Sequence, residues 1–299
     1  MIKPMLATRW PRPFDDPDWW FEPKWDGFRF VASEDGVLSR NGNDLAGRFP
    51  DVGRWVIPSG VVLDGELVVM DESGITSFSM LQASMSRQGS QLQGILFDVL
   101  VWGGMQVMDD PLEHRRERLD QLDLPGYLAP SPYFEGSGLA LWATVQREGY
   151  EGMVAKRLGS RYLPGRRSPD WRKIVHRRSA RVIVGGYLPG GGNRSNTLGS
   201  VLVGVQSDEG LKWVGAVGSG FSSRDLMAFR DALSQMERDT PPFADVTGIP
   251  REAVWVETTL VIRVEYASVT GQGRLRAPVF VAVDQVDPSE VTAESEFGL

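Results

Sequence analysis

Lys24 stands in the string Lys24-Trp25-Asp26-Gly27-Phe28-Arg29, which is the part of the chain most suited to covalent chemistry. A lysine amine that has lost its proton is a nucleophile. Asp26 follows two residues later, where its carboxylate can bridge to the amine or to a metal ion beside it. A Lys-x-Asp-Gly string also occurs in ordinary surface turns, so its meaning depends on what accompanies it.

Four further polar signatures follow Lys24 in a fixed order. They are Ser39-Arg40-Asn41-Gly42, Asp64-Gly65-Glu66, Glu151-Gly152-Met153-Val154-Ala155-Lys156 and Trp171-Arg172-Lys173. Each has an ordinary explanation when taken alone, such as a strand-edge turn for the second or a solvated lysine at the end of the third. Their joint order predicts a nucleotidyltransferase whose lysine becomes covalently nucleotidylated.

This chemistry places demands on the groups around Lys24. Attack on the α-phosphate of a nucleotide requires a neutral amine, although the ordinary pKa of a lysine side chain is about 10.4. Nearby positive charges and a bound metal ion lower that pKa, and they also stabilise the charge on a departing pyrophosphate. Lys156 and Lys173 are the candidates for these positive charges.

Carboxylates and one aromatic ring complete the predicted site. Glu66 and Glu151 offer the oxygen ligands that Mg²⁺ (or Mn²⁺) prefers. Phe97 lies in an apolar run, where its ring can either stack on a nucleotide base or pack in the core. The two histidines, His114 and His176, are too few and too far apart to suggest a zinc site.

Composition narrows the class of protein. The 299 residues carry a net charge of −7 and no cysteine, which excludes disulfides and thiolate metal sites. No apolar run reaches the ~18 residues of a membrane span and no signal peptide is evident, so we expect a cytoplasmic protein. Ten of residues 156–181 are basic and one is acidic. This basic segment is either a solvated loop or a phosphate-binding surface.

Residue patterns in the first part of the chain predict a mixture of strands and helices. The predicted elements are strands at residues 61–70, 94–102 and 151–157 and a helix at residues 111–122. Asp64 and Glu66 are two residues apart on a strand, so they share one face. We therefore expect an α+β fold for a first domain at residues 1–180.

The pattern changes after about residue 178, where short strands alternate with turns rich in Gly, Asn and Asp. The predicted strands are residues 182–187, 198–206, 211–217, 253–266 and 279–283. Residues 222–236 are the one predicted helix, capped by Ser222 or Ser223. We interpret Pro189-Gly190-Gly191-Gly192-Asn193 as a hairpin loop rather than a phosphate cradle. Short strands around one helix predict a small five-stranded barrel over residues 181–299.

Taken together, these signatures resemble those of the ATP-dependent DNA ligases, a branch of the covalent nucleotidyltransferases that also contains capping enzymes and RNA ligases. Pro4-Met5-Leu6-Ala7 looks like the opening of small bacterial ligases and of the ligase module of bacterial end-joining proteins. Residues 213–221 and 273–280 look like the family's oligonucleotide-binding barrel. The resemblance implies a nucleotidyltransferase domain with ATP-grasp-like antiparallel sheets, followed by an OB-fold domain.

The resemblance also implies a role for each site residue. Lys24 would take AMP from ATP, pass it to the 5′-phosphate of a nick, and let the 3′-hydroxyl displace AMP to seal the strand. The implied contacts are Glu22 and Phe97 for adenine; Arg29 and Arg40 for ribose, phosphate or the 5′-phosphate of the nick; Glu66 for ribose or metal; Glu151 for metal; and Lys156, Arg167 and Lys173 for phosphates.

One position departs from the family pattern. Asp284 stands where an arginine that orients pyrophosphate is expected, and Arg274 or Arg276 would have to substitute for it. The implied partners are nicked double-stranded DNA and a DNA end-binding or repair-polymerase protein, with a monomer acting at the nucleoid. Two alternatives stay open: an RNA-ligating or GTP-dependent capping enzyme, and a nick-binding protein that has lost catalysis.

Overall fold

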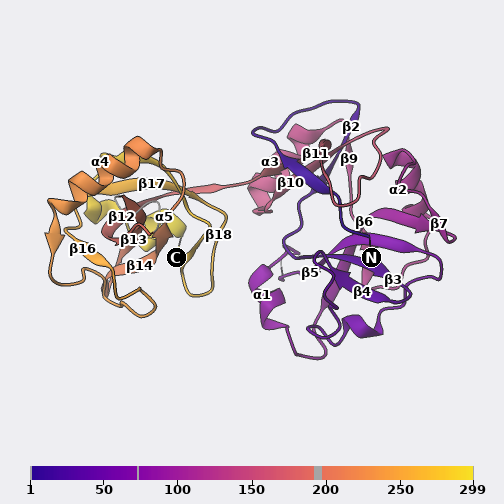
Figure 1. Cartoon of the computed structure of the whole chain (residues 1–299), viewed down its shortest axis with the longest axis horizontal. Coiled ribbons are helices and arrows are strands. Elements are labelled where there is room, and N and C mark those ends of the chain that lie inside the picture. Colours follow the sequence, from indigo (N-terminus) through magenta and orange to yellow (C-terminus); the bar gives the residue numbers. More distant parts are fainter. Residues whose placement is uncertain (1, 73, 192–196, 299) are drawn as a thin grey trace. The chain divides into compact units, whose positions relative to one another are not determined.

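The computed structural model describes residues 2–72, 74–191 and 197–298, and the chain divides into two units, Met1–His176 and Arg177–Leu299 (Figure 1). The sequence predicted a boundary after residue 180. Strand β12 (Arg178–Pro189) pairs with β17 (Val261–Tyr266) from Arg178 onward, so residues 178–180 run within a strand of the second unit. Gly192 and Asn193 of the expected hairpin loop lie outside the described residues.

One sheet of the first unit brings together strands from distant parts of the chain. In spatial order it contains β1 (Leu6–Arg9), β11 (Arg167–Val175), β10 (Gly152–Arg157), β2 (Trp19–Pro23) and β9 (Phe134–Glu135). Strand β1 runs parallel to β11, whereas β10 is antiparallel to both β11 and β2. The carboxyl end of β2, the start of β10 and the basic end of the first unit therefore meet in one sheet.

A second sheet of the first unit carries the other signatures. Its strands are β4 (Gly36–Ser39), β3 (Phe28–Ser33), β5 (Val62–Val69), β6 (Leu92–Trp102) and β7 (Met105–Gln106), with β8 (Leu128–Pro130) paired to β6. The associated helices are α1 (Phe78–Ala83), α2 (Leu112–Asp120) and α3 (Gly138–Glu148), and residues Val52–Arg54 form the 3₁₀ turn η1. The predicted strands at 61–70 and 94–102 and the predicted helix at 111–122 correspond to β5, β6 and α2. The sequence did not predict α1 or α3.

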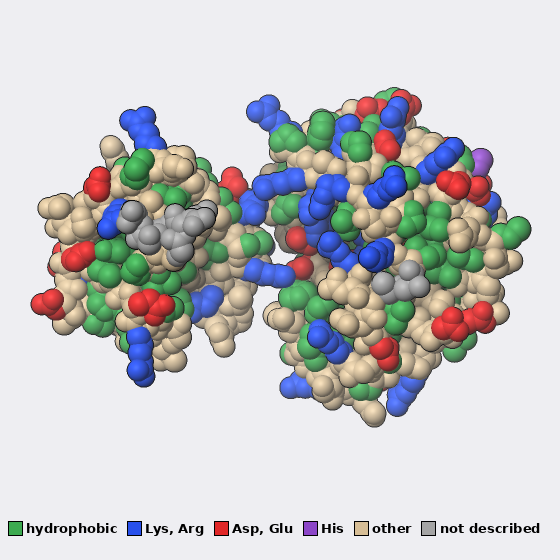
Figure 2. Space-filling view, viewed as in Figure 1, with side chains coloured by type: hydrophobic (Ala, Val, Ile, Leu, Met, Phe, Trp, Pro, Cys, Tyr) green, Lys and Arg blue, Asp and Glu red, His purple; other side chains and the backbone are tan. Residues whose placement is uncertain are grey.

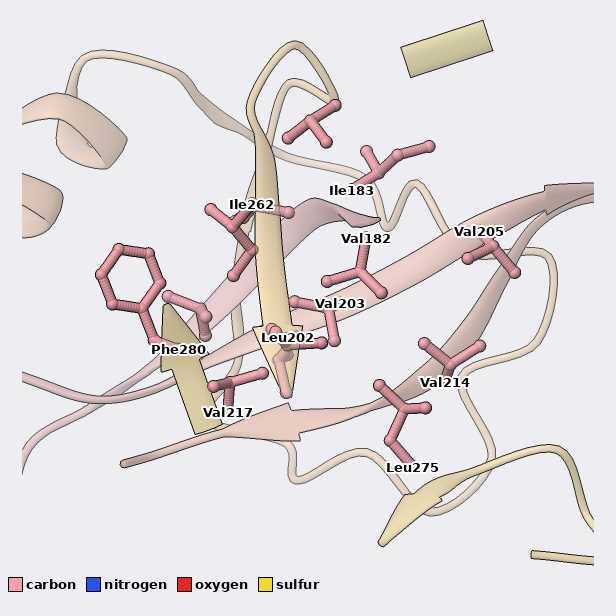
Figure 3. Packing of buried hydrophobic residues seen from close by; sticks show 14 of the residues in the cluster. Val182, Ile183, Leu202, Val203, Val205, Val214, Val217, Ile262, Leu275 and Phe280 are labelled. Atoms are coloured by element: carbon pink, nitrogen blue, oxygen red, sulfur yellow. The ribbon is translucent and has the colours of Figure 1, made fainter. Parts of the chain in front are cut away.

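The second unit is a curled sheet closed around an apolar core. Its long strands are β12, β13 (Leu198–Ser207), β14 (Gly210–Val217), β17 and β20 (Val279–Asp284). Two short strands, β15 (Glu237–Arg238) and β16 (Val254–Val256), extend it along β12, and β18 (Ser268–Val269) and β19 (Leu275–Arg276) form a separate hairpin. Figure 3 shows side chains such as Val182, Leu202, Val214 and Ile262 gathered between these strands. The expected α+β fold with a terminal OB-type barrel is confirmed.

Two expectations for the second unit are refined by the strand pairing. Residues 253–266, predicted as one strand, form β16 and β17, because both pair with different halves of the long β12. The predicted helix is α4 (Ser223–Ser234), and Ser222 and Asp225 form a reciprocal capping box at its start. The 3₁₀ turn η3 (Pro288–Glu290) and helix α5 (Ala293–Phe297) end the described chain. No helix among the described residues is long and apolar enough to cross a membrane.

Candidate active site

A cavity of about 210 Å³ lies in the first unit where the two sheets face each other. The strands beside it come from both sheets: β2, β10 and β11 from the first, and β3, β5 and β6 from the second. Nine of the eleven predicted site residues line it, namely Glu22, Lys24, Arg29, Arg40, Glu66, Phe97, Lys156, Arg167 and Lys173. Signatures separated by more than a hundred residues thus surround one space.

Lys24 is fixed at the end of β2 by backbone and side-chain contacts. Its backbone N–H donates to the carbonyl of Gly152 at 2.9 Å, and its ammonium group forms an ion pair with the Glu151 carboxylate. Gly152 has a φ of 151°, and a Cβ there would lie 2.2 Å from the carbonyl oxygen of Ile174. Only glycine fits at this point of the sheet. The Glu-Gly pair therefore brings the Glu151 carboxylate to the Lys24 amine, although Glu151 does not itself line the cavity.

Lys156 and Glu22 form a buried ion pair at the cavity wall. The Lys156 Nζ donates to Glu22 Oε1 at 2.6 Å and to the Phe97 carbonyl at 3.0 Å, and both charged side chains are at most 5% exposed. Burial lowers the pKa of Lys156 and the Glu22 charge opposes that effect. The solvated-lysine interpretation of Lys156 is therefore wrong, because water is excluded from its ammonium group.

Arg29 and Glu66 come from neighbouring strands on the opposite wall. Arg29 forms a bidentate pair with Asp64, with two bonds of 2.6 Å, and its guanidinium carbon lies 4.5 Å from the centre of the Phe97 ring. Glu66 stands opposite Arg29 in the β3–β5 pairing. Burial raises the pKa of Glu66 to about 7, while Arg29 and Lys24 act in the opposite direction. A cation bound beside Glu66 would favour its ionised form.

Three further cations face the cavity without a carboxylate partner among the described residues: Arg40, Arg167 and Lys173. Burial lowers the pKa of Lys173, and the charges of Lys24 and Arg167 lower it further. Figure 2 shows Lys and Arg side chains gathered on one face of the first unit. The site therefore has an excess of positive charge, which suits a polyphosphate ligand.

Sequence reasoning left out several residues that the structure places in or behind the cavity. Trp171 belongs to a quoted signature but was given no role; it is 1% exposed, lines the cavity, and lies 4.5 Å from the Lys156 Nζ. Asp64 and Tyr162 are buried behind Arg29. Their signal was present only as a polar residue within an apolar strand and as a tyrosine near the basic segment.

Two predicted positions are not at the cavity wall. The backbone N–H of Asp26 donates to the Thr76 hydroxyl at 3.2 Å, and Asp26 is not among the lining residues, so its role stays a prediction. In the second unit, Asp284 ends β20 opposite Val261. Arg274, offered above as a substitute, lies on the Trp213 ring at 3.9 Å.

Comparison with known proteins assigns both units. The family model described as "ATP dependent DNA ligase domain" matches residues 4–174, and "ATP dependent DNA ligase C terminal region" matches residues 194–285. The chain belongs to the ATP-dependent DNA ligase family. The resemblance in the five signatures is thereby confirmed, and the cavity lies in the ligase domain.

Relatives of this ligase-family chain include larger proteins. It is 34% identical to the "Multifunctional non-homologous end joining protein LigD" of Mycobacterium bovis, over 98% of the chain but 40% of that protein. It is 34% identical to "DNA ligase C1" of Mycolicibacterium smegmatis, covering 75% of the chain and 70% of that protein. The chain thus spans about 40% of the length of the LigD relative.

Solved structures share the fold along nearly the whole chain. The crystal structure of the ligase domain from M. tuberculosis LigD is 32% identical, with a TM-score of 0.55 and coverage of 97% of this chain and 98% of that one. A second mycobacterial DNA ligase D structure, with the same identity and TM-score, is described as a complex with ATP and MES. A Lig E DNA ligase, at 18% identity and a TM-score of 0.65, shares the fold.

Proposed function

We propose that the chain seals 5′-phosphate/3′-hydroxyl nicks in duplex DNA with ATP, through a lysyl–AMP intermediate on Lys24. The observation that carries the proposal is the position of Lys24. Its amine is paired with a carboxylate at the edge of a cavity that six basic side chains line. Such a cavity suits a triphosphate whose α-phosphorus is attacked by the lysine.

Residues on the two walls divide the work of the first step. In the ion pair, the Glu151 carboxylate holds a proton of the Lys24 ammonium group, and it is placed to accept that proton when the amine becomes the nucleophile. The positive charges of Lys173, Arg167 and Arg40 face the phosphates and stabilise pyrophosphate as it leaves. Attack by Nζ forms the P–N bond while the bond between the α- and β-phosphates breaks.

The nucleoside end of ATP is assigned to the buried end of the cavity. Glu22, held by Lys156, offers its second carboxylate oxygen to the adenine edge, and Phe97 offers its ring. Arg29 and Glu66 are assigned to the ribose and the adjacent phosphate. The buried Lys156–Glu22 pair is held in one orientation, so the base meets a preformed polar edge.

A divalent ion fits the carboxylates at this site. No cluster of three or more His, Asp or Glu residues that could hold a metal occurs among the described residues. Mg²⁺ needs only one or two protein carboxylates, because phosphates and water complete its coordination. Glu66 and Glu151 are the residues that would hold it, and the raised pKa of Glu66 reflects a carboxylate short of positive charge. When bound, Mg²⁺ (or Mn²⁺) neutralises phosphate charge.

DNA is assigned to the exposed basic residues of the first unit. Arg157, Arg161, Arg166 and Arg167 are exposed, and only the first two have carboxylate partners among the described residues, at 3.8 and 3.7 Å. Binding through phosphates would weaken steeply with salt. We further propose that the chain acts as a monomer on DNA in the cytoplasm, within a repair pathway that includes an end-binding or polymerase partner.

The test is covalent labelling followed by sealing. Protein freed of bound AMP with pyrophosphate is incubated with Mg²⁺ and α-labelled ATP or GTP, denatured and separated on a gel. We expect label from ATP that is lost in Lys24→Ala and kept in Lys3→Ala, which removes an exposed lysine of the same unit. The labelled protein should then seal a nicked duplex without added ATP.

The other outcomes separate the alternatives. Label from GTP alone would indicate a capping-type enzyme, and sealing of nicked RNA but not DNA would indicate an RNA ligase. Binding of nicked duplex with no label from either nucleotide would indicate a nick-binding protein, with Asp284 as the first position to examine.

A further inference from the structure

We infer that Tyr162 is a positioning residue that orients Arg29 toward the bound nucleotide by holding Asp64. Tyr162 lies between β10 and β11, outside every signature identified in the sequence. It does not line the cavity. The inference rests on the proposed function only in taking Arg29 as a contact of ATP.

Four groups form a closed ring of hydrogen bonds behind the cavity wall. The Tyr162 hydroxyl donates to Asp64 Oδ2 at 2.5 Å and accepts the backbone N–H of Met5 at 2.9 Å. Asp64 accepts two bonds of 2.6 Å from Arg29. Arg29 closes the ring by donating to the Met5 carbonyl at 3.4 Å. Each member is therefore held by two others.

The ring is sealed from water on every side except that of Arg29. Met5 and Asp64 are 0% exposed and Tyr162 is 1% exposed, whereas the Arg29 side chain is 21% exposed and lines the cavity. A buried carboxylate accepts all the donors available to it, so removal of one donor changes how it holds the others. The only member that can report a change to a ligand is Arg29.

The hydroxyl keeps its proton throughout the working pH range. Burial raises the pKa of Tyr162 and the negative charge of Asp64 raises it further. The phenol therefore remains a donor to Asp64, which stays an acceptor for Arg29. A phenylalanine would keep the ring packing against Trp171, whose centroid is 5.7 Å away, and would remove only the hydroxyl.

The same tyrosine also fixes the first residues of the chain. Its hydroxyl holds the Met5 backbone, and Pro4, Leu6 and Ala7 on either side of Met5 line the cavity. Leu163, the next residue, donates its N–H to the Met5 sulfur at 3.1 Å. A loop remote in sequence therefore sets both a cation and a stretch of backbone at the nucleotide site.

The experiment is a double-mutant cycle on lysyl–AMP formation with full-length protein. Wild type, Tyr162→Phe, Arg29→Ala and the double variant are compared for rate and for the ATP concentration that gives half the maximal rate. We expect Tyr162→Phe alone to reduce the ratio of rate to half-saturating ATP about tenfold, the effect of losing one hydrogen bond to a charged group. In the Arg29→Ala background the same substitution should change the ratio less than about twofold, because its effect passes through Arg29.

Controls separate positioning from folding. Tyr127→Phe removes a hydroxyl that accepts the Val56 N–H at 2.8 Å in the same unit, and its labelling should match that of wild type. Asp64→Asn tests the same ring if Tyr162→Phe does not fold, and its effect should also disappear in the Arg29→Ala background.

Two results would overturn the inference. One is a Tyr162→Phe variant that labels like wild type, and the other is an equal fold-loss for Tyr162→Phe with and without Arg29. Absence of label in wild type is a separate outcome, since it would refute the proposed function before the cycle is measured.

Discussion

Buried charge divides the two units of this chain. All ten buried polar or charged side chains among the described residues lie in the first unit, from Glu22 to Ser168. The described part of the second unit buries none, and its core consists of aliphatic and aromatic side chains. Buried ions are costly to desolvate and often contribute little to stability. Their concentration around one cavity indicates that the first interior is arranged to hold a ligand, whereas the second is arranged to hold itself together.

The strongest way to test this contrast is Lys24→Ala, the largest expected effect on activity. We expect lysyl–AMP formation to fall by a factor of at least ~10³, because no other amine is placed as the nucleophile. Stability should change by no more than about 1 kcal/mol, since the Lys24–Glu151 pair is partly exposed. Labelling and urea unfolding of the same preparation check both statements. A loss of stability as large as the loss of activity would mean that Lys24 is a structural residue.

Breaking the Lys156–Glu22 pair should give the largest loss of stability. Lys156→Met leaves the Glu22 carboxylate buried and without its cation, and we expect a cost of about 3–5 kcal/mol in the free energy of unfolding. Adding Glu22→Gln should recover much of that loss without recovering labelling, because the charge is removed but the polar edge for adenine is not restored. Urea unfolding of the single and double variants measures this. Recovery of labelling together with stability would assign the pair to folding alone.

The barrel should respond to a different kind of change. Leu202 is 0% exposed in its core, and Leu202→Ala should cost about 2–4 kcal/mol through the cavity that it creates. No second substitution that only removes a charge can rescue it, because no buried charge lies in the described part of that core. Calorimetry, with Leu202→Met as the volume-conserving control, checks this. A negligible cost would show that the barrel core is loosely packed, contrary to the contrast drawn here.

The same division explains what could be predicted from the sequence. Alternating strands, the capped helix at Ser222 and the ordered signatures depend on local spacing, and they predicted the fold and most of the cavity lining. Helix α3 was missed because it is short and begins at a glycine within a turn-like stretch. Partner choice was not predictable, since Lys156 finds Glu22 across 134 positions and Tyr162 finds Asp64 across 98. Such pairs depend on how two sheets face each other, which no local pattern records.

The smallest expected effect concerns the one buried tyrosine–carboxylate bond of the barrel. Tyr187 donates to Glu237 Oε1 at 2.6 Å, and burial together with that bond raises the pKa of Tyr187 to about 12. The unfolded chain releases this proton near pH ~10. The folded state therefore binds more protons between these values, and the stabilisation, complete below pH ~10, is lost as the pH rises toward about 12.

Tyr187→Phe isolates this contribution. Because Glu237 is exposed and can be hydrated once the bond is lost, the variant should be less stable than wild type by only about 1 kcal/mol at pH 8. That difference should shrink between pH ~10 and about 12 and vanish above it. Unfolding at several pH values measures it, with Tyr127→Phe as the comparison in the first unit. A difference that does not change with pH would show that Tyr187 titrates normally, and that even the single polar contact of the barrel interior carries no electrostatic effect.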